Sequence, residues 1–132
     1  MSELGEQRHR ARERAFEILY EWTIKNRPIP EILNSLPIQP DPYTTTLVRA
    51  VETHREWAEA KLSEHSIQWP LGRMPIVDRL IMTMALCELQ LDDAPPRAVV
   101  FDEAVELAKI YSSDSAPAFV NGLLTACVSA NE

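Results

Sequence analysis

The sequence predicts an all-α fold, a compact single domain of six or seven helices that spans residues 1–132. Apolar residues recur at three- and four-residue spacing along most of the chain, and no segment alternates convincingly with the period of two typical of strands. Most of the ten prolines are bunched at 28–42, 70–75 and 95–96, where they separate helices. The 45% hydrophobic and 25% charged content is that of an ordinary globular protein, which excludes a disordered chain.

The first predicted helix covers residues 8–25, and residues 1–7 are expected to form a flexible arm before it. Its buried stripe consists of Ala11, Ala15, Ile18, Leu19 and Trp22. Arg27 precedes a proline and therefore disfavours the helical conformation, which ends the helix. A short helix is predicted over 30–36, followed by a proline-rich turn over 37–42.

The next two predicted helices are long and differ in how deeply they are buried. The first covers 43–65 and leads into a turn at 69–72. The second has Pro75 in its first turn, a position that suits proline because its missing N–H has no partner there anyway. This second helix ends near Leu89 and is apolar over more than half of its circumference, so we expect it to be the central one.

Two further helices complete the predicted domain. One covers 99–111 after a joint at 92–96, and the last contains the apolar residues from 119 to 128 after a serine-rich loop at 112–116. Asp102, Glu103 and Glu106 are expected at the start of the first of these, where negative charge interacts favourably with the helix dipole.

No pattern in the chain is typical of a catalytic, metal or cofactor site. The three histidines are scattered, and the three glycines form no phosphate-binding loop. Cys87 and Cys127 lie in apolar helical patterns without CxxC spacing, so we interpret them as reduced core residues rather than a disulfide or reactive pair. We therefore expect a protein that is not an enzyme and that carries no metal or cofactor.

The chain also lacks the signals of export or membrane insertion. Its first ten residues, MSELGEQRHR, are polar and charged, and no run of about 18 apolar residues occurs. We therefore expect a cytoplasmic protein with no membrane partner.

The charge distribution is the most informative feature for function. The net charge of the chain is −7. The segment between Gln7 and Phe16 nevertheless contains four arginines and only one acidic residue, Glu13. This stretch carries +3, so the rest of the chain carries −10. A basic segment on an acidic body indicates a localised contact with a polyanion.

The spacing of these arginines predicts an RNA contact. Arg8 and Arg12 lie one helical turn apart, as do Arg10 and Arg14, and the two pairs occupy opposite flanks. We therefore expect the first residues to unwind and wrap a ligand. Guanidinium groups bind phosphates and stack on unpaired bases, and Tyr20, beside the apolar stripe, is a candidate stacking platform. The alternative is a set of solvated charges that pair with nearby carboxylates.

Four segments, in chain order, resemble the NusB family. They are RHRARERAFEILYEW (8–22), RMPIVDRLIMTMALCEL (73–89), FDEAVELAKIYS (101–112) and AFVNGLLTA (118–126). The resemblance implies a double three-helix bundle, monomeric or homodimeric. It also implies binding of single-stranded boxA-like RNA together with NusE, a small-subunit ribosomal protein, within the RNA polymerase antitermination complex that promotes ribosomal RNA transcription.

The resemblance also implies two sets of site residues. Those implied to contact RNA are Arg8, His9, Arg10, Arg12, Arg14, Tyr20 and Phe119. Those implied to contact the protein partner are Asp78, Arg79 and Met82.

The chain departs from the family pattern at several positions. Thr83 replaces a frequent arginine, so we expect an ion pair with Glu88 to be missing. Glu17 replaces a frequent glutamine and places a negative charge near the expected RNA path, and Asp102 replaces an asparagine. Either Asp114 or Ser115 occupies the acidic loop position of the family.

Two other functions remain open at this stage. The first is a helical module of the same fold that binds proteins and has lost RNA binding. The second is a domain cut from a ribosomal RNA methyltransferase, although the chain carries no catalytic half and no nucleotide-binding motif.

Overall fold

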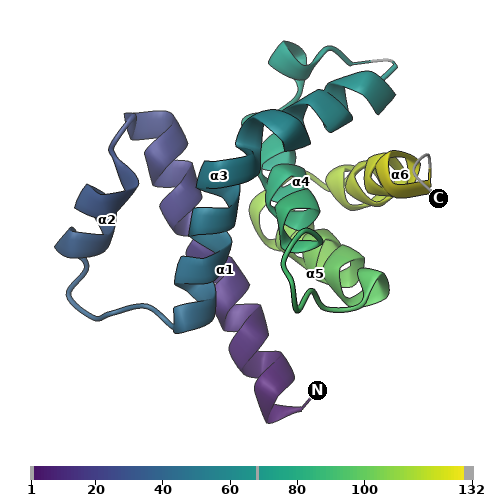
Figure 1. The fold of residues 1–132 in the computed structure, drawn as a ribbon. Helices are drawn as coiled ribbons and strands as arrows, with labels where there is room; N and C mark the ends of the chain where they lie inside the picture. The colour runs from purple at the N-terminus through teal and green to yellow at the C-terminus, as the bar shows by residue number, and fades with distance from the viewer. Residues whose placement is uncertain (1, 68, 130–132) are drawn as a thin grey trace.

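The computed structural model describes residues 2–67 and 69–129, which form six α-helices, one single-turn 3₁₀ helix and no strand (Figure 1). The elements are α1 (Glu3–Lys25), α2 (Ile29–Ser35), α3 (Pro42–His65), η1 (Leu71–Arg73), α4 (Ile76–Glu88), α5 (Arg97–Tyr111) and α6 (Ala116–Ser129). The predicted all-α class is confirmed.

The helices form two groups of three that meet at α3 and α4. In Figure 1, α1, α2 and the first half of α3 lie on one side of the molecule, α4, α5 and α6 lie on the other, and the end of α3 extends to that second side. Helix α3 packs against both α1 and α4, and α5 packs against both α4 and α6. This is the double three-helix arrangement that the sequence predicted.

Helix α1 begins five residues earlier than predicted. The Oγ atom of Ser2 accepts a hydrogen bond from the backbone N–H of Gly5, and the first turn contains Glu3 and Glu6. A capping serine and acidic residues both stabilise a helix N-terminus. Residues 3–7 are therefore part of the helix rather than an arm before it, whereas unwinding of these residues around a ligand stays a prediction; Met1 lies outside the described residues.

Helix α5 also begins earlier than predicted, at Arg97, directly after Pro96. Its first turn contains no acidic residue. Asp102, Glu103 and Glu106 are therefore too far along the helix to interact with its N-terminal dipole, and the prediction that they start the helix is wrong.

Helix α4 is the centre of the molecule, as predicted. Every residue from Leu80 to Glu88 is buried, because α1, α3, α5 and α6 all pack around this helix. Cys87 and Cys127 are buried and form no disulfide. Burial raises the pKa of the Cys87 thiol to about 12 and that of Cys127 to about 11, so both remain protonated core residues.

Within the described ranges, no helix combines the length and the apolar character needed to cross a bilayer.

A buried ion pair connects the two groups of helices. The Nε and Nη2 atoms of Arg12 on α1 donate to the Glu88 carboxylate on α4, at 3.0–3.1 and 2.8 Å. The Tyr43 hydroxyl on α3 donates to the same carboxylate, and Glu103 on α5 lies 3.6 Å from Arg12 Nη1. Both Arg12 and Glu88 are at most 2% exposed. Four helices therefore meet at one pair of opposite charges.

This pair corrects an expectation from the sequence. The arginine that the family often has at position 83 is absent, yet Glu88 is not left without an ionic partner, because Arg12 supplies the guanidinium from another helix. The Thr83 hydroxyl is buried and has no hydrogen-bond partner among the described residues.

His9 extends the ion-pair network towards the surface. Its Nδ1 atom lies 2.7 Å from Glu103 Oε2, and its Nε2 atom lies 3.2 Å from Glu13 Oε1. The hydrogen bond with Glu103 raises the pKa of His9 above its usual 6.5, against the opposing effect of partial burial. The charged imidazolium therefore belongs to the folded state.

We predict that Arg12→Met destabilises the fold by about 3–5 kcal/mol, because it leaves the buried Glu88 carboxylate without its cation. Urea unfolding measures this change. Arg14→Met is the matched control: Arg14 is 41% exposed in its pair with Glu17, so its loss should cost at most about 0.5 kcal/mol. Equal unfolding midpoints for the two variants would show that the buried pair does not hold the helices together.

We also predict that His9 makes stability depend on pH. Because the folded-state pKa is raised, the contribution of protonated His9 is fully present below pH 6.5 and is lost as pH rises through the raised pKa. The free energy of urea unfolding should therefore fall less steeply between pH 6 and 8.5 in His9→Gln than in the wild type. Parallel pH profiles for the two proteins would contradict this prediction.

Candidate nucleic-acid interface

Three of the four arginines in the basic segment of α1 lie at the surface. Arg10 is exposed and has no hydrogen bond or ion pair with the residues that the structure describes. Arg14 is 41% exposed, and its Nη1 atom lies 3.4 Å from Glu17 Oε1. Arg8 is partly exposed, with its guanidinium carbon 4.1 Å from the centroid of the Tyr43 ring. These side chains are placed where a phosphate can reach them.

Arg12 and His9 do not belong to this exposed set. The Arg12 guanidinium is enclosed by Glu88 and Glu103, so the expectation that it contacts RNA is wrong. The helical period explains the difference, because Arg12 lies three and four residues before Ala15 and Phe16, on the face of α1 that packs against the other helices. His9 lies between two carboxylates, which take up both of its ring nitrogens inside the protein.

An aromatic strip continues the basic segment along α1. Tyr20 is 38% exposed, and its ring centroid lies 6.1 Å from that of Phe16. Phe16 in turn packs at 4.6 Å against Tyr111 from the end of α5. One exposed tyrosine ring thus lies on the same helix as the three accessible arginines and is supported by the buried ring of Phe16.

Glu17 lies between these aromatic and basic residues, as the sequence suggested. Its carboxylate accepts a hydrogen bond from the Tyr111 hydroxyl at 3.1 Å and pairs with Arg14. Burial and the nearby Glu17 charge raise the pKa of Tyr111 to about 12, which keeps its hydroxyl a donor. The negative charge of Glu17 is therefore partly compensated within the protein.

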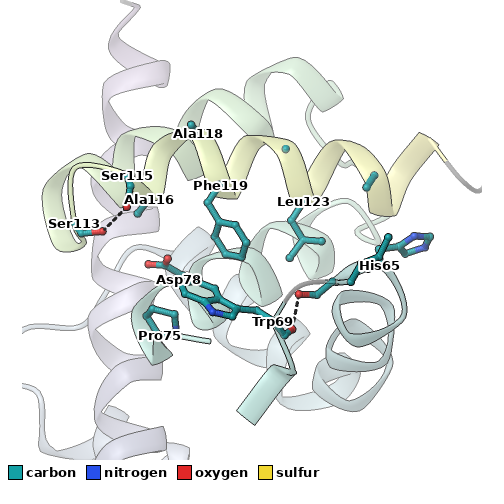
Figure 2. A pocket seen from close by; sticks show the side chains of 14 residues that line it. His65, Trp69, Pro75, Asp78, Ser113, Ser115, Ala116, Ala118, Phe119 and Leu123 are labelled. Atoms are coloured by element: carbon teal, nitrogen blue, oxygen red, sulfur yellow. Dashed lines mark hydrogen bonds between the residues drawn. The ribbon is translucent and has the colours of Figure 1, made fainter. Parts of the chain in front are cut away.

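Phe119 lies in a different place, in a groove of about 690 Å³ between the end of α3, the start of α4 and α6 (Figure 2). Its ring points from α6 into the groove and meets Trp69 edge to face, with centroids 5.2 Å apart. Trp69 is 42% exposed. The sequence placed Trp69 only in a predicted turn, and a tryptophan in a turn directly before Pro70 was the available signal for a surface aromatic.

The loop that contains the two candidates for the acidic family position also borders this groove. Ser113 and Ser115 line it, with their Oγ atoms 3.3 Å apart, whereas Asp114 is exposed and is not one of the residues that line the groove. The residue that faces the groove is therefore the serine.

The three predicted partner residues are less accessible than expected. Met82 is fully buried and Asp78 is 3% exposed, so the prediction that Met82 contacts a partner is wrong and Asp78 reaches only the edge of the groove. The Asp78 carboxylate accepts a hydrogen bond from the Ser112 hydroxyl. Arg79 is partly exposed and lies 3.8 Å from Glu59. The reason is the central position of α4, which leaves only its first turn near the surface.

In the parts of the chain that the structure describes, no three histidine, cysteine, aspartate or glutamate side chains form a group able to hold a metal ion. The chemistry available at this surface is that of hydrogen bonding, ion pairing and stacking.

Comparisons with known proteins agree with this arrangement. The NusB family model matches residues 9–129. The transcription antitermination protein NusB of Saccharopolyspora erythraea is 43% identical over 124 residues, covering 89% of this chain and 83% of the relative. NusB of T. maritima superimposes with a TM-score of 0.82 at 26% identity, covering 92% and 90% of the two chains.

A second solved structure adds partners to the comparison. A complex of the antitermination factors NusB and NusE with dsRNA contains a chain that matches with a TM-score of 0.81 at 26% identity, covering 95% of this chain and 98% of the other. A family model that matches residues 9–129 and a relative with 43% identity leave one assignment: this chain belongs to the NusB family.

Proposed function

We propose that this protein is a transcription antitermination factor that binds RNA through the outer face of α1 and performs no catalysis. The observation that carries the proposal is the position of Arg8, Arg10 and Arg14 at the surface of a protein whose net charge is −7. Because the rest of the molecule repels a polyanion, RNA is directed to this face. The membership of the NusB family supports the same function.

In the proposed mechanism the protein binds and orients RNA without changing it chemically. The arginines neutralise phosphates, and the exposed ring of Tyr20 stacks on an unpaired base. An unpaired base exposes both of its faces, whereas bases in a duplex are stacked on each other, so this surface favours single-stranded RNA of the boxA type. The solved relative in complex with dsRNA makes the choice between single and double strands a point for experiment.

We further propose a NusE-like protein as the second partner, since a relative of the same fold is found in a complex of NusB, NusE and RNA. The groove that contains Phe119 and Trp69 exposes aromatic surface and is bordered by Asp78, one of the predicted partner residues. The complex acts in the cytoplasm on RNA polymerase. A homodimer that covers α1 competes with RNA, so light scattering with and without RNA distinguishes a monomer from a homodimer.

We predict that the affinity for a boxA-like single strand falls with salt at a slope of about −2 on logarithmic axes, because three arginines rather than four are accessible. Fluorescence anisotropy at several salt concentrations, with a NusE-like protein present, measures the slope. A scrambled strand and a duplex of the same sequence are the controls, and both should bind more weakly.

Charge reversal separates this function from that of a module that binds only proteins. Arg10→Glu removes an exposed cation without disturbing the buried pair, whereas reversal of Arg12 would disrupt the fold. RNA binding should collapse in Arg10→Glu while binding of the NusE-like protein persists. If the wild type retains the protein partner but shows no salt-dependent RNA binding, the chain is a protein-binding module.

We predict that Tyr20→Ala weakens RNA binding by about 1–3 kcal/mol, the usual contribution of one base stacked on an aromatic ring. Because Tyr20 is 38% exposed, the thermal stability should change little. Tyr20→Trp, which retains a flat ring, is the matched control and should bind as well as the wild type. Equal loss of affinity in both variants would show that no base stacks at this position.

A further inference from the structure

We propose that Tyr43 is a positioning residue of the RNA-binding surface, whose ring holds the guanidinium of Arg8 with its N–H groups free to contact a phosphate. Tyr43 lies on α3, outside the basic segment, and neither the sequence pattern nor the family resemblance stated above pointed to it. The inference rests on the proposed RNA-binding function of α1.

Tyr43 is held by hydrogen bonds at its backbone N–H and at its hydroxyl. Its backbone N–H donates to Asp41 Oδ1 at 2.7 Å, where Asp41 caps the start of α3. Its hydroxyl donates to Glu88, which the Arg12 guanidinium holds in place. Burial, and next the Glu88 carboxylate, raise the pKa of Tyr43, so its hydroxyl stays protonated and remains a donor. The aromatic face is therefore presented in one orientation by the buried ion pair.

Arg8 packs on this fixed face, with its guanidinium carbon 4.1 Å from the ring centroid. A cation–π contact uses the flat face of the guanidinium, whereas its five N–H donors lie in the plane of the group. The contact restricts the side chain without using its donors. Arg14 shows the contrast, because its Nη1 atom is directed at the carboxylate of Glu17.

One carboxylate lies close enough to compete for Arg8. The pKa of Asp41 is lowered mainly by the hydrogen bond from the Tyr43 backbone, then by one from the Gln7 side chain, and also by the charge of Arg8. Both oxygens of Asp41 already accept hydrogen bonds, from Tyr43 and from Gln7 at 2.7 Å. Asp41 therefore attracts Arg8 by charge alone, since no hydrogen bond or ion pair between the two side chains is formed among the described residues.

The alternative is that Tyr43 only stabilises the fold through its bond to Glu88. A structural role of that kind lowers stability when Tyr43 is replaced, but it does not make the contribution of Arg8 to RNA binding depend on Tyr43. A double-mutant cycle measures that dependence directly.

The experiment compares Arg8→Ala, Tyr43→Leu and the double variant by fluorescence anisotropy with the single-stranded RNA used above. Arg8→Ala should weaken binding about twofold to fivefold in the wild-type background, which corresponds to one exposed cation–π contact. In the Tyr43→Leu background Arg8→Ala should weaken binding clearly less, because an Arg8 side chain that no ring holds already contributes less to the phosphate contact. Arg14→Ala is the matched control and should weaken binding by the same factor in both backgrounds.

Equal effects of Arg8→Ala in both backgrounds would overturn the inference and leave the proposed function intact. If the wild type binds no RNA at all, the proposed function fails and this inference fails with it. A measurement on the free wild-type protein covers the case in which Tyr43→Leu does not fold. The side-chain protons of Arg8 should show an upfield ring-current shift in NMR spectra relative to those of Arg10, and its absence would also overturn the inference.

Discussion

The buried ion pair between Arg12 and Glu88 is the constraint on which the rest of the structure depends. A charge removed from water is costly unless it is paired and its hydrogen bonds are satisfied, so α1, α4 and the tyrosine from α3 must meet in one geometry. Hydrophobic contacts alone tolerate small sliding movements between helices, whereas a bidentate guanidinium–carboxylate contact does not. The pair therefore fixes how the two groups of helices face each other, and it also fixes the face of α1 that remains outside.

One short segment of α1 combines a structural and a binding role because the helical period separates its side chains. Arg12 points into the protein and holds the helices together, while Arg10 and Arg14 point to solvent. Arg8 is partly exposed and packs against the ring of Tyr43. A local charge of +3 in the sequence thus becomes a smaller but better-ordered basic surface, because one cation is neutralised internally and another is oriented by an aromatic ring.

The aromatic residues divide between two places that serve different contacts. Tyr20 continues the basic face of α1 and rests on Phe16, which packs on Tyr111. Phe119 and Trp69 face each other across the groove between α3, α4 and α6. Under the proposed function, with RNA and a protein as partners, one small domain needs two binding surfaces. The central helix α4 carries both, since its last residue anchors α1 and its first turn borders the groove.

The sequence by itself determined the helical class, narrowed the helices to six or seven and determined the central position of α4, because periodicity and proline placement are local properties of the chain. It also determined that basic residues gather on the first helix, and the family motifs identified the relatives. Only the tertiary structure decided which arginine is buried, because Glu88 is 76 residues away from Arg12 along the chain. The same holds for Met82, hidden by neighbouring helices, and for Tyr43 and Trp69, whose partners come from other segments. Spacing along one helix says which side chains share a face, but the packing of the other helices decides which face is covered.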